Sequence, residues 1–301
     1  MFPYRKILCP TDFSDLSDEA LKVAGVLAAR FEAELCVLHV VTPPPPDLAA
    51  VGYISATFLQ ENLTPAREQL EALVAERVPA TVSTRTLLGY GGTVDEIERA
   101  VRGENADLIV LATHGLTGWR HLIYGSVTEE TARIAPCPVL AIHHGKNGAG
   151  TKSLLPVKKI LCAVDFSEPA SEALSQAGAL AEYFGAELEV LNVVMTLSER
   201  LASGEYSTSE YDRLRLSEAQ ARLCELIAER TPTKAGAKPL VRLGNAAEEI
   251  ERAAKEEQTD LIVLATHGLT GWRHLVYGSV AERVLHLTQF PLLVVHATNL
   301  Q

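Results

Sequence analysis

The chain has no excess of positive charge and no long apolar run. Among its 301 residues, 27 are Lys or Arg and 38 are Asp or Glu, which gives a formal net charge of −11. Binding to a nucleic-acid backbone or an anionic membrane needs a basic face, so this balance argues against both partners. The longest apolar runs, such as LIVLA from Leu108, are too short to span a bilayer. Because the N-terminus also lacks a signal-peptide pattern, we expect a cytoplasmic protein.

The chain also lacks cysteine pairs and the common enzyme motifs. Its five cysteines form no C-x-x-C pair, so neither a disulfide scaffold nor a cysteine zinc site is predicted. Cys9 and Cys162 fall within predicted strands, where buried packing is favoured over a nucleophilic role. The motifs G-x-x-x-x-G-K-[ST], G-x-G-x-x-G, G-x-S-x-G and H-E-x-x-H are all missing. These absences exclude the enzyme classes that are easiest to recognise and leave weak hydrolysis open.

The chain contains two copies of one sequence unit. The 21-residue segment DLIVLATHGLTGWRHLIYGSV from Asp107 recurs from Asp260, and the two copies differ only at Ile123 and Val276. The offset of 153 residues aligns the two halves without a gap, which indicates a whole-domain duplication. We therefore predict domains at 1–145 and 157–301, joined by a linker rich in Gly, Lys and Ser at 146–156.

Strand and helix patterns alternate along each half. Apolar runs at KILCPTD from Lys6, LCVLHVV from Leu35 and DLIVLAT from Asp107 are typical of buried strands. Residues 20–31 and 66–74 place apolar side chains at helical spacing, and the copy of the first helix has a candidate C-cap at Gly185. We therefore predict an α/β fold with two doubly wound domains, each a five-stranded parallel sheet flanked by helices.

The loop after DLIVLAT has the composition of a phosphate cradle. Glycines at Gly115 and Gly125 allow backbone amides to approach an anion, and a helix begins near Ser126. The pattern Ser126-x-x-Glu129, repeated at Ser279, is also a capping box, which accounts for these residues without a ligand. The two interpretations are compatible, because a capping Ser can turn toward a ligand.

These features together resemble the universal stress protein family in its tandem, two-domain form. The matching stretches cover almost the whole chain and include Pro10-Thr11-Asp12-Phe13-Ser14, Leu38-His39-Val40, and Ala112-Thr-His-Gly115-x9-Gly125-Ser126-Val127. The resemblance implies an ATP or AMP site in each half, with the Asp near the ribose, backbone groups of Val40 or Val193 at the adenine, and the loop at the phosphates. The residues so implied are Pro10, Thr11, Asp12, Val40, Gly91, Ala112, Gly115, Gly125, Ser126 and Val127, and then Asp165, Val193, Gly244, Ala265, Gly268, Gly278, Ser279 and Val280.

The chain departs from the family pattern at one position in each half. Nucleotide-binding members carry G-x2-G-x9-G-[ST], whereas here Ala112 and Ala265 replace the first glycine. Alanine is tolerated if the backbone needs a negative φ, and it weakens the site if φ must be positive or if the phosphate must approach closely.

Three functions fit this sequence. The first is a stress-response regulatory module that binds ATP or AMP. The second is a slow hydrolase in which Asp12 or Asp165, with Mg²⁺, positions water, although Asp before a helix more often serves a turn or N-cap. The third is an interaction protein of the same fold that binds no nucleotide. The last strand of each half is expected at a sheet edge, where the halves would pair as a pseudo-two-fold dimer and two chains could form a homodimer.

Overall fold

The computed structural model forms two compact units, each built from the strands and helices of one sequence copy. The structure describes residues 3–43, 56–113, 126–143, 156–195, 208–231, 236–266 and 279–296. Apart from its last residue, the predicted linker therefore lies outside the described residues, and the predicted domain limits stay predictions.

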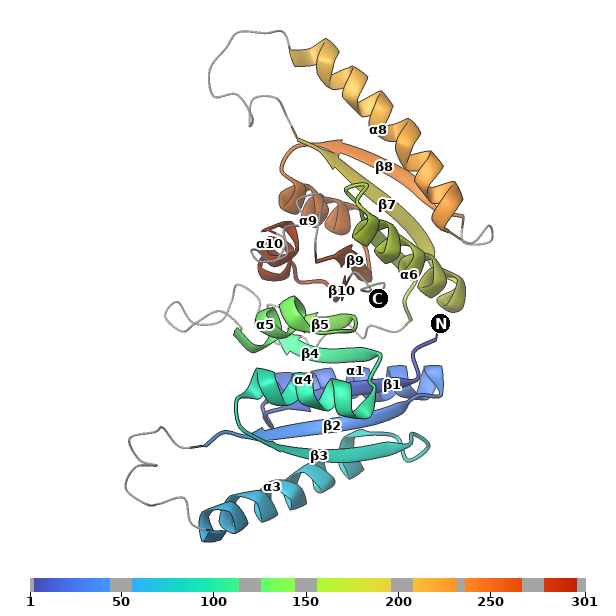
Figure 1. Ribbon diagram of the computed structural model, residues 1–301. Helices are drawn as coiled ribbons and strands as arrows, with labels where there is room; N and C mark the ends of the chain where they lie inside the picture. The colour runs from blue at the N-terminus through green and yellow to red at the C-terminus, as the bar shows by residue number, and fades with distance from the viewer. Residues whose placement is uncertain are drawn as a thin grey trace. The chain divides into compact units, whose positions relative to one another are not determined.

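The elements of both units follow the predicted alternation of strand and helix (Figure 1). Unit 1 contains β1 (Lys6–Thr11), α1 (Asp15–Phe31), β2 (Glu34–Val41), α3 (Ala56–Arg77), β3 (Thr84–Tyr90), α4 (Thr93–Glu104), β4 (Leu108–Thr113), α5 (Ser126–Ile134) and β5 (Val139–His143). Unit 2 contains β6 (Lys159–Ala163), α6 (Glu168–Phe184), β7 (Glu187–Val194), α8 (Thr208–Arg230), β8 (Lys238–Leu243), α9 (Ala246–Glu256), β9 (Leu261–Ala265), α10 (Ser279–Leu287) and β10 (Leu292–Val295).

The described residues of each unit form five parallel strands in the same order. Unit 1 has the order β3-β2-β1-β4-β5, and unit 2 has the equivalent order β8-β7-β6-β9-β10. The chain moves outward from β1 through β2 to β3, then returns to the other side of β1 with β4. The order therefore reverses between β1 and β4, and between β6 and β9 in unit 2. This confirms the predicted doubly wound α/β fold.

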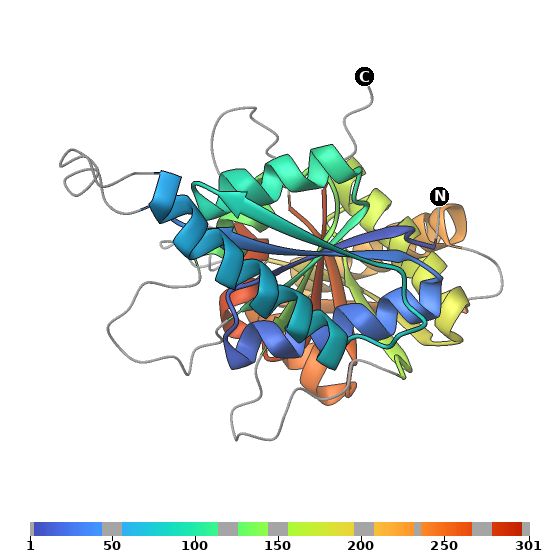
Figure 2. The same ribbon diagram turned by 90° about the horizontal axis from the view of Figure 1, so that it is seen from below.

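Helices cover both faces of each sheet, which explains why the strands are apolar throughout. In unit 1, α1 and α3 pack on one face and α4 and α5 pack on the other; Figure 2 shows α4 on the side of the strands opposite α1 and α3. Strand residues such as Ile7, Leu8 and Ile109 are completely buried. The predicted apolar face of α1 is buried along its length, at Ala20, Leu21, Ala24, Leu27, Ala28 and Phe31. None of the helices in the described part of the chain is long and apolar enough to cross a membrane.

The ends of the first helix in each unit show how local sequence sets the boundaries. Ser14 and Ser167 are N-caps that accept a hydrogen bond from a first-turn amide, at 3.2 Å and 3.3 Å. Gly185 caps the end of α6 with a φ of +65°, which confirms the predicted C-cap. Its counterpart in α1 is Glu32, which adopts the same left-handed conformation without glycine.

Candidate functional site

The strands separate at the point where their order reverses. The ladder between β1 and β4 contains two residue pairs, Ile7 with Leu108 and Leu8 with Ile109, whereas the β1–β2 ladder contains six. In unit 2, β6 and β9 share three pairs, against five for β6 and β7. Ligands of open α/β sheets bind in the crevice outside the carboxyl ends of strands at such a reversal. Each unit therefore has a candidate site at this edge.

A tight turn with an aspartate follows the central strand of each unit. In unit 1, Asp12 Oδ1 accepts hydrogen bonds from the Ser14 hydroxyl at 2.6 Å and the Ser14 amide at 3.0 Å. Between them, Phe13 adopts a φ of +64°, which is uncommon for a bulky side chain. The turn role that the sequence offered as an alternative for Asp12 is therefore confirmed.

Unit 2 repeats this turn with the same geometry. Asp165 Oδ1 accepts from the Ser167 hydroxyl at 2.5 Å and from its amide at 3.1 Å, and Phe166 has a φ of +65°. The two phenyl rings have different neighbours: Phe13 lies 4.2 Å from the His39 ring, and Phe166 lies 4.3 Å below the Arg222 guanidinium. Each ring therefore lies against another side chain, a histidine ring in unit 1 and an arginine guanidinium in unit 2.

The same hydrogen bonds stabilise the ionised form of the Asp12 carboxyl group. Partial burial raises the pKa of this carboxyl, but donation from the Ser14 hydroxyl and amide outweighs burial, so the pKa lies below its ordinary value of 3.8. The residue remains exposed at the carboxyl edge. An ionised, exposed carboxylate repels phosphate and accepts hydrogen bonds from hydroxyl groups, which suits a sugar better than a phosphate at this position.

The end of β2 extends beyond the residues that pair with β1. The Gly91 amide donates to the Val41 carbonyl at 3.3 Å, which places the backbone groups of Val41 on the β3 side. Neighbouring strand residues direct their backbone groups to opposite sides, so those of Val40 face the β1 side. There the last pair is Thr11 with His39, one residue earlier. The backbone of Val40 therefore lies past the paired part of β1.

The glycine that follows β3 is required by the turn itself. Gly91 has a φ of +152°, and a Cβ built on it would lie 2.9 Å from Oε1 of the buried Glu96. Gly244 repeats this arrangement with a φ of +145° and a Cβ position 3.1 Å from Glu249 Oε1. Its amide donates to the Val194 carbonyl at 3.0 Å, so Val193 corresponds in position to Val40. These glycines are explained structurally, and their contact with a ligand stays a prediction.

The alanines that replace the first motif glycine have ordinary strand geometry. Among described residues other than glycine, positive φ occurs at Phe13, Glu32, Asn105, Phe166 and Gln258, and thus at neither Ala112 nor Ala265. The substitution therefore imposes no backbone strain. The Ala112 carbonyl accepts a hydrogen bond from the buried Thr128 hydroxyl at 2.7 Å, which joins the end of β4 to the first turn of α5.

The remaining predicted loop residues are only partly covered by the structure. Gly115, Gly125, Gly268 and Gly278 lie outside the described residues. Ser126 and Ser279 begin α5 and α10, as predicted, but their side chains also lie outside the description. Val127 is half-buried and Val280 is exposed in the first turns of these helices. The phosphate cradle thus stays a prediction at these positions.

Sequence reasoning missed a side chain that fixes the end of the central strand. His39 Nδ1 lies 2.8 Å from the Thr11 carbonyl, and Asn192 Nδ2 donates to the Val164 carbonyl at the same distance. The residues are 153 positions apart, and both can donate from a nitrogen. That shared ability, visible in the alignment of the two halves, was the signal that could have identified them.

Two other groups of residues do not contribute to the site. Cys9, Cys36, Cys137 and Cys162 are buried, and burial raises the pKa of their thiols, to about 12 for Cys9 and Cys137 and about 11 for Cys36. The predicted packing role of Cys9 and Cys162 is therefore confirmed.

An apolar crevice between α4 and α5 is lined by Val94, Ile97, Ile109 and Ile134, and offers few polar groups to a nucleotide.

Comparison with known proteins follows the same division into halves. A model of the universal stress protein family matches residues 3–143 and 156–296. The chain is similar to a universal stress protein of Methanocaldococcus jannaschii, with 36% identity over 146 residues, which is 48% of this chain and 84% of that protein. It is also similar to a universal stress protein of Mycolicibacterium smegmatis, with 26% identity over 298 residues and 96% of each chain covered.

A solved structure shares the fold across both halves. The crystal structure of a universal stress protein from Archaeoglobus fulgidus covers 98% of this chain and 99% of its own, with a TM-score of 0.70. Sequence identity is 21%, so this likeness concerns the fold alone.

Proposed function

The chain belongs to the universal stress protein family in its tandem form, and we propose that each half binds an adenine nucleotide, ATP or AMP, at the carboxyl edge of its sheet. The observation that carries the proposal is the separation of β1 from β4, and of β6 from β9, where the strand order reverses. Asp12 follows β1 and Ala112 lies at the end of β4, and Asp165 and Ala265 have the corresponding places in unit 2. In this proposal the protein is a regulatory module whose associations respond to the bound nucleotide.

The groups at this edge suit the ribose, the adenine and the phosphates of a nucleotide in turn. The carboxylates of Asp12 and Asp165 accept hydrogen bonds from ribose hydroxyls, because both side chains are exposed at this edge and carboxylate oxygens are acceptors. Backbone groups of Val40 and Val193, beyond the paired part of the central strand, are directed at the adenine. The N-termini of α5 and α10 offer amides and a favourable dipole to the phosphates. Mg²⁺ would accompany the phosphates when ATP is bound.

Calorimetric titration with Mg-ATP and with AMP tests this proposal. In Asp12→Asn, Oδ1 still accepts from Ser14, so the turn is kept while the charge is removed. The matched control is Asp15→Asn, which removes an exposed charge from the first turn of α1. We expect Asp12→Asn to weaken binding at one site and Asp15→Asn to leave it unchanged. Equal effects of the two variants would show that Asp12 contributes only general negative charge.

Slow ATP hydrolysis is the alternative function. Phosphate release that depends on Mg²⁺ and is lost in the Asp12→Ala, Asp165→Ala double variant would favour it. Turnover that persists in that variant would show that these residues are not needed for the reaction.

A cytoplasmic location, the intrachain pseudo-dimer and a homodimer stay predictions. Sedimentation of the full chain measures whether the homodimer forms.

A further inference from the structure

A group of charged side chains lies at the amino edge of each sheet, opposite the candidate nucleotide site. In unit 1, Lys6 Nζ lies 2.9 Å from Glu34 and 3.7 Å from Glu104. Arg85 contacts the same two carboxylates, at 3.4 Å and 3.3 Å. The buried thiol of Cys36 lies beside this group. Two cations therefore face two carboxylates, and these charges balance without a proton.

Unit 2 has the same group with one carboxylate more. Four of the five positions, 153 residues further on, keep the sign of their charge and are Lys159, Glu187, Lys238 and Glu257. At the fifth position Glu189 replaces Cys36. Lys159 Nζ lies 3.3 Å from Glu257 and 3.6 Å from Glu189. Glu187 contacts both lysines, at 3.9 Å and 3.3 Å. At these five positions, two cations therefore face three carboxylates.

The additional carboxylate is buried and incompletely bonded. Glu189 is 7% exposed, and its Oε2 atom accepts no hydrogen bond within the described part of the chain. Arg242 on β8 also acts on Glu257, but it is paired with Glu256 at 2.6 Å. A buried carboxylate with a free oxygen beside a second carboxylate is unfavourable. A proton on Glu189 removes this cost, because the resulting O–H can donate to Glu257.

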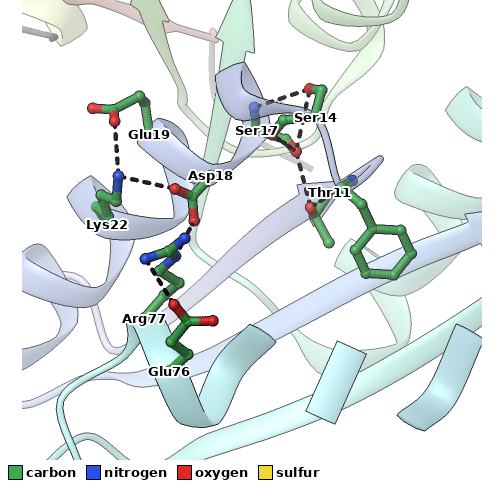
Figure 3. A network of polar contacts seen from close by, with 9 residues as sticks. Thr11, Ser14, Ser17, Asp18, Glu19, Lys22, Glu76 and Arg77 are labelled. Carbon is green, nitrogen blue, oxygen red and sulfur yellow. Dashed lines mark hydrogen bonds and ion pairs between the residues drawn. The ribbon is translucent and has the colours of Figure 1, made fainter. Parts of the chain in front are cut away.

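An excess carboxylate needs no proton where water reaches it. Figure 3 shows Asp18, Glu19 and Glu76 around Lys22 and Arg77, which is also three carboxylates with two cations. Glu76 there is 66% exposed, so solvent stabilises its charge. Burial of Glu189, and not the count of charges alone, therefore distinguishes the amino edge of unit 2.

We propose that Glu189 and Glu257 form a proton-dependent lock that joins β7 to the end of α9. The lock is closed when the pair shares one proton, and it opens when that proton passes to water and the two carboxylates repel each other. Burial raises the pKa of Glu189 above 4.5; Lys159 opposes this shift, and Glu257 reinforces it. The lock is therefore fully closed below pH 4.5 and opens as the pH rises through the folded-state pKa. The inference does not depend on nucleotide binding.

Hydrogen exchange of the full chain between about pH 4.5 and about pH 7.5, corrected for the intrinsic rate at each pH, tests this proposal. The Thr259 amide donates to the Ala254 carbonyl of α9 at 3.0 Å, and the Ala106 amide makes the equivalent bond to Val101 in unit 1. We expect the protection of Thr259 to fall as the pH rises, by up to about tenfold for each unit by which the folded-state pKa exceeds the ordinary value. The protection of Ala106 should stay constant.

Three variants separate the shared proton from general charge. Glu189→Gln should keep the protection of Thr259 high at every pH, because the amide can always donate to Glu257. Glu189→Cys copies unit 1 and should also remove the pH dependence. The matched control is Glu187→Gln, which removes a 59% exposed carboxylate from the same strand and should leave the pH dependence in place.

The inference would be overturned by Thr259 protection that does not change with pH in the wild type. It would also be overturned if the pH dependence survived in Glu189→Gln, or if Glu187→Gln abolished it as completely. None of these results would bear on the proposed nucleotide sites, which lie at the other edge of the sheet.

Discussion

Two glycines twelve residues apart should respond in opposite directions to the same substitution. Gly91 has a φ of +152°, and a Cβ there would lie 2.9 Å from Oε1 of Glu96, which is 7% exposed and paired with Arg99. Gly103 lies in α4, and a Cβ there would meet no atom within 4 Å. Alanine is therefore strained and crowded at the first position and unhindered at the second.

The expected magnitudes follow from these surroundings. A non-glycine residue in such a region of φ costs about 1–3 kcal/mol, and displacing a buried, paired carboxylate adds to this cost. We expect Gly91→Ala to lower the free energy of unfolding of unit 1 by about 2–4 kcal/mol. Gly103→Ala should raise it by about 0.5–1 kcal/mol, because alanine loses less backbone entropy in a helix than glycine does.

Denaturant unfolding followed by circular dichroism measures both changes in the full chain. Gly244→Ala extends the test to unit 2, where Glu249 is held by Arg252 at 2.7 Å. The reasoning would be refuted if Gly91→Ala were as stable as the wild type, since neither the backbone conformation nor the contact with Glu96 would then be needed. Loss of nucleotide binding at full stability would instead assign Gly91 to the ligand.

Further predictions concern ionisable groups. Burial, opposed by Lys159 and reinforced by Glu257, raises the pKa of Glu189 above 4.5, so its contribution to stability is full below that pH and is lost as the pH rises through the folded-state value. Glu189→Gln should therefore unfold at higher denaturant than the wild type at pH 7, and the two should converge near pH 4. Asp12 has a lowered pKa, so its contribution to the free energy of unfolding is present above pH 3.8 and is lost as the pH falls. Asp12→Ala should lower the free energy of unfolding by about 0.5–1 kcal/mol at pH 7, and Asp12→Asn should lower it less. In acid, both variants should approach the stability of the wild type. A maleimide should label only Cys224 in the folded chain and all five cysteines after unfolding; rapid labelling of Cys9 would contradict its burial.

The sequence was sufficient to predict the fold because its two copies carry the same pattern. Continuous apolar strands between amphipathic helices admit few arrangements other than a parallel sheet covered on both faces. The left-handed residues were harder to anticipate. Phe13 and Glu32 have no local preference for positive φ, and their conformations depend on hydrogen bonds to neighbours in the turn and in the helix end. Such bonds become visible only when the strand and helix are placed together.

The candidate site could be predicted in location and only partly in detail. Asp12 and Val40 end neighbouring strands, so their common edge follows from any parallel arrangement. The roles of Thr128 and His39 could not be read in the same way, because each bonds to a carbonyl that is distant in sequence. The sequence also left open whether alanine strains the motif, which the strand geometry of Ala112 and Ala265 answers.

The most direct test of the account is to denature the purified full chain, with no nucleotide added, and to quantify released ATP, ADP and AMP by chromatography and mass spectrometry, followed by titration of the emptied protein with Mg-ATP. We predict that adenine nucleotide is released or that titration gives binding heat and a higher melting temperature, as expected for a ligand that binds the folded state. Absence of released nucleotide together with a titration that gives neither heat nor a melting shift would contradict nucleotide binding, and the chain would then be an interaction protein that keeps the fold without the ligand.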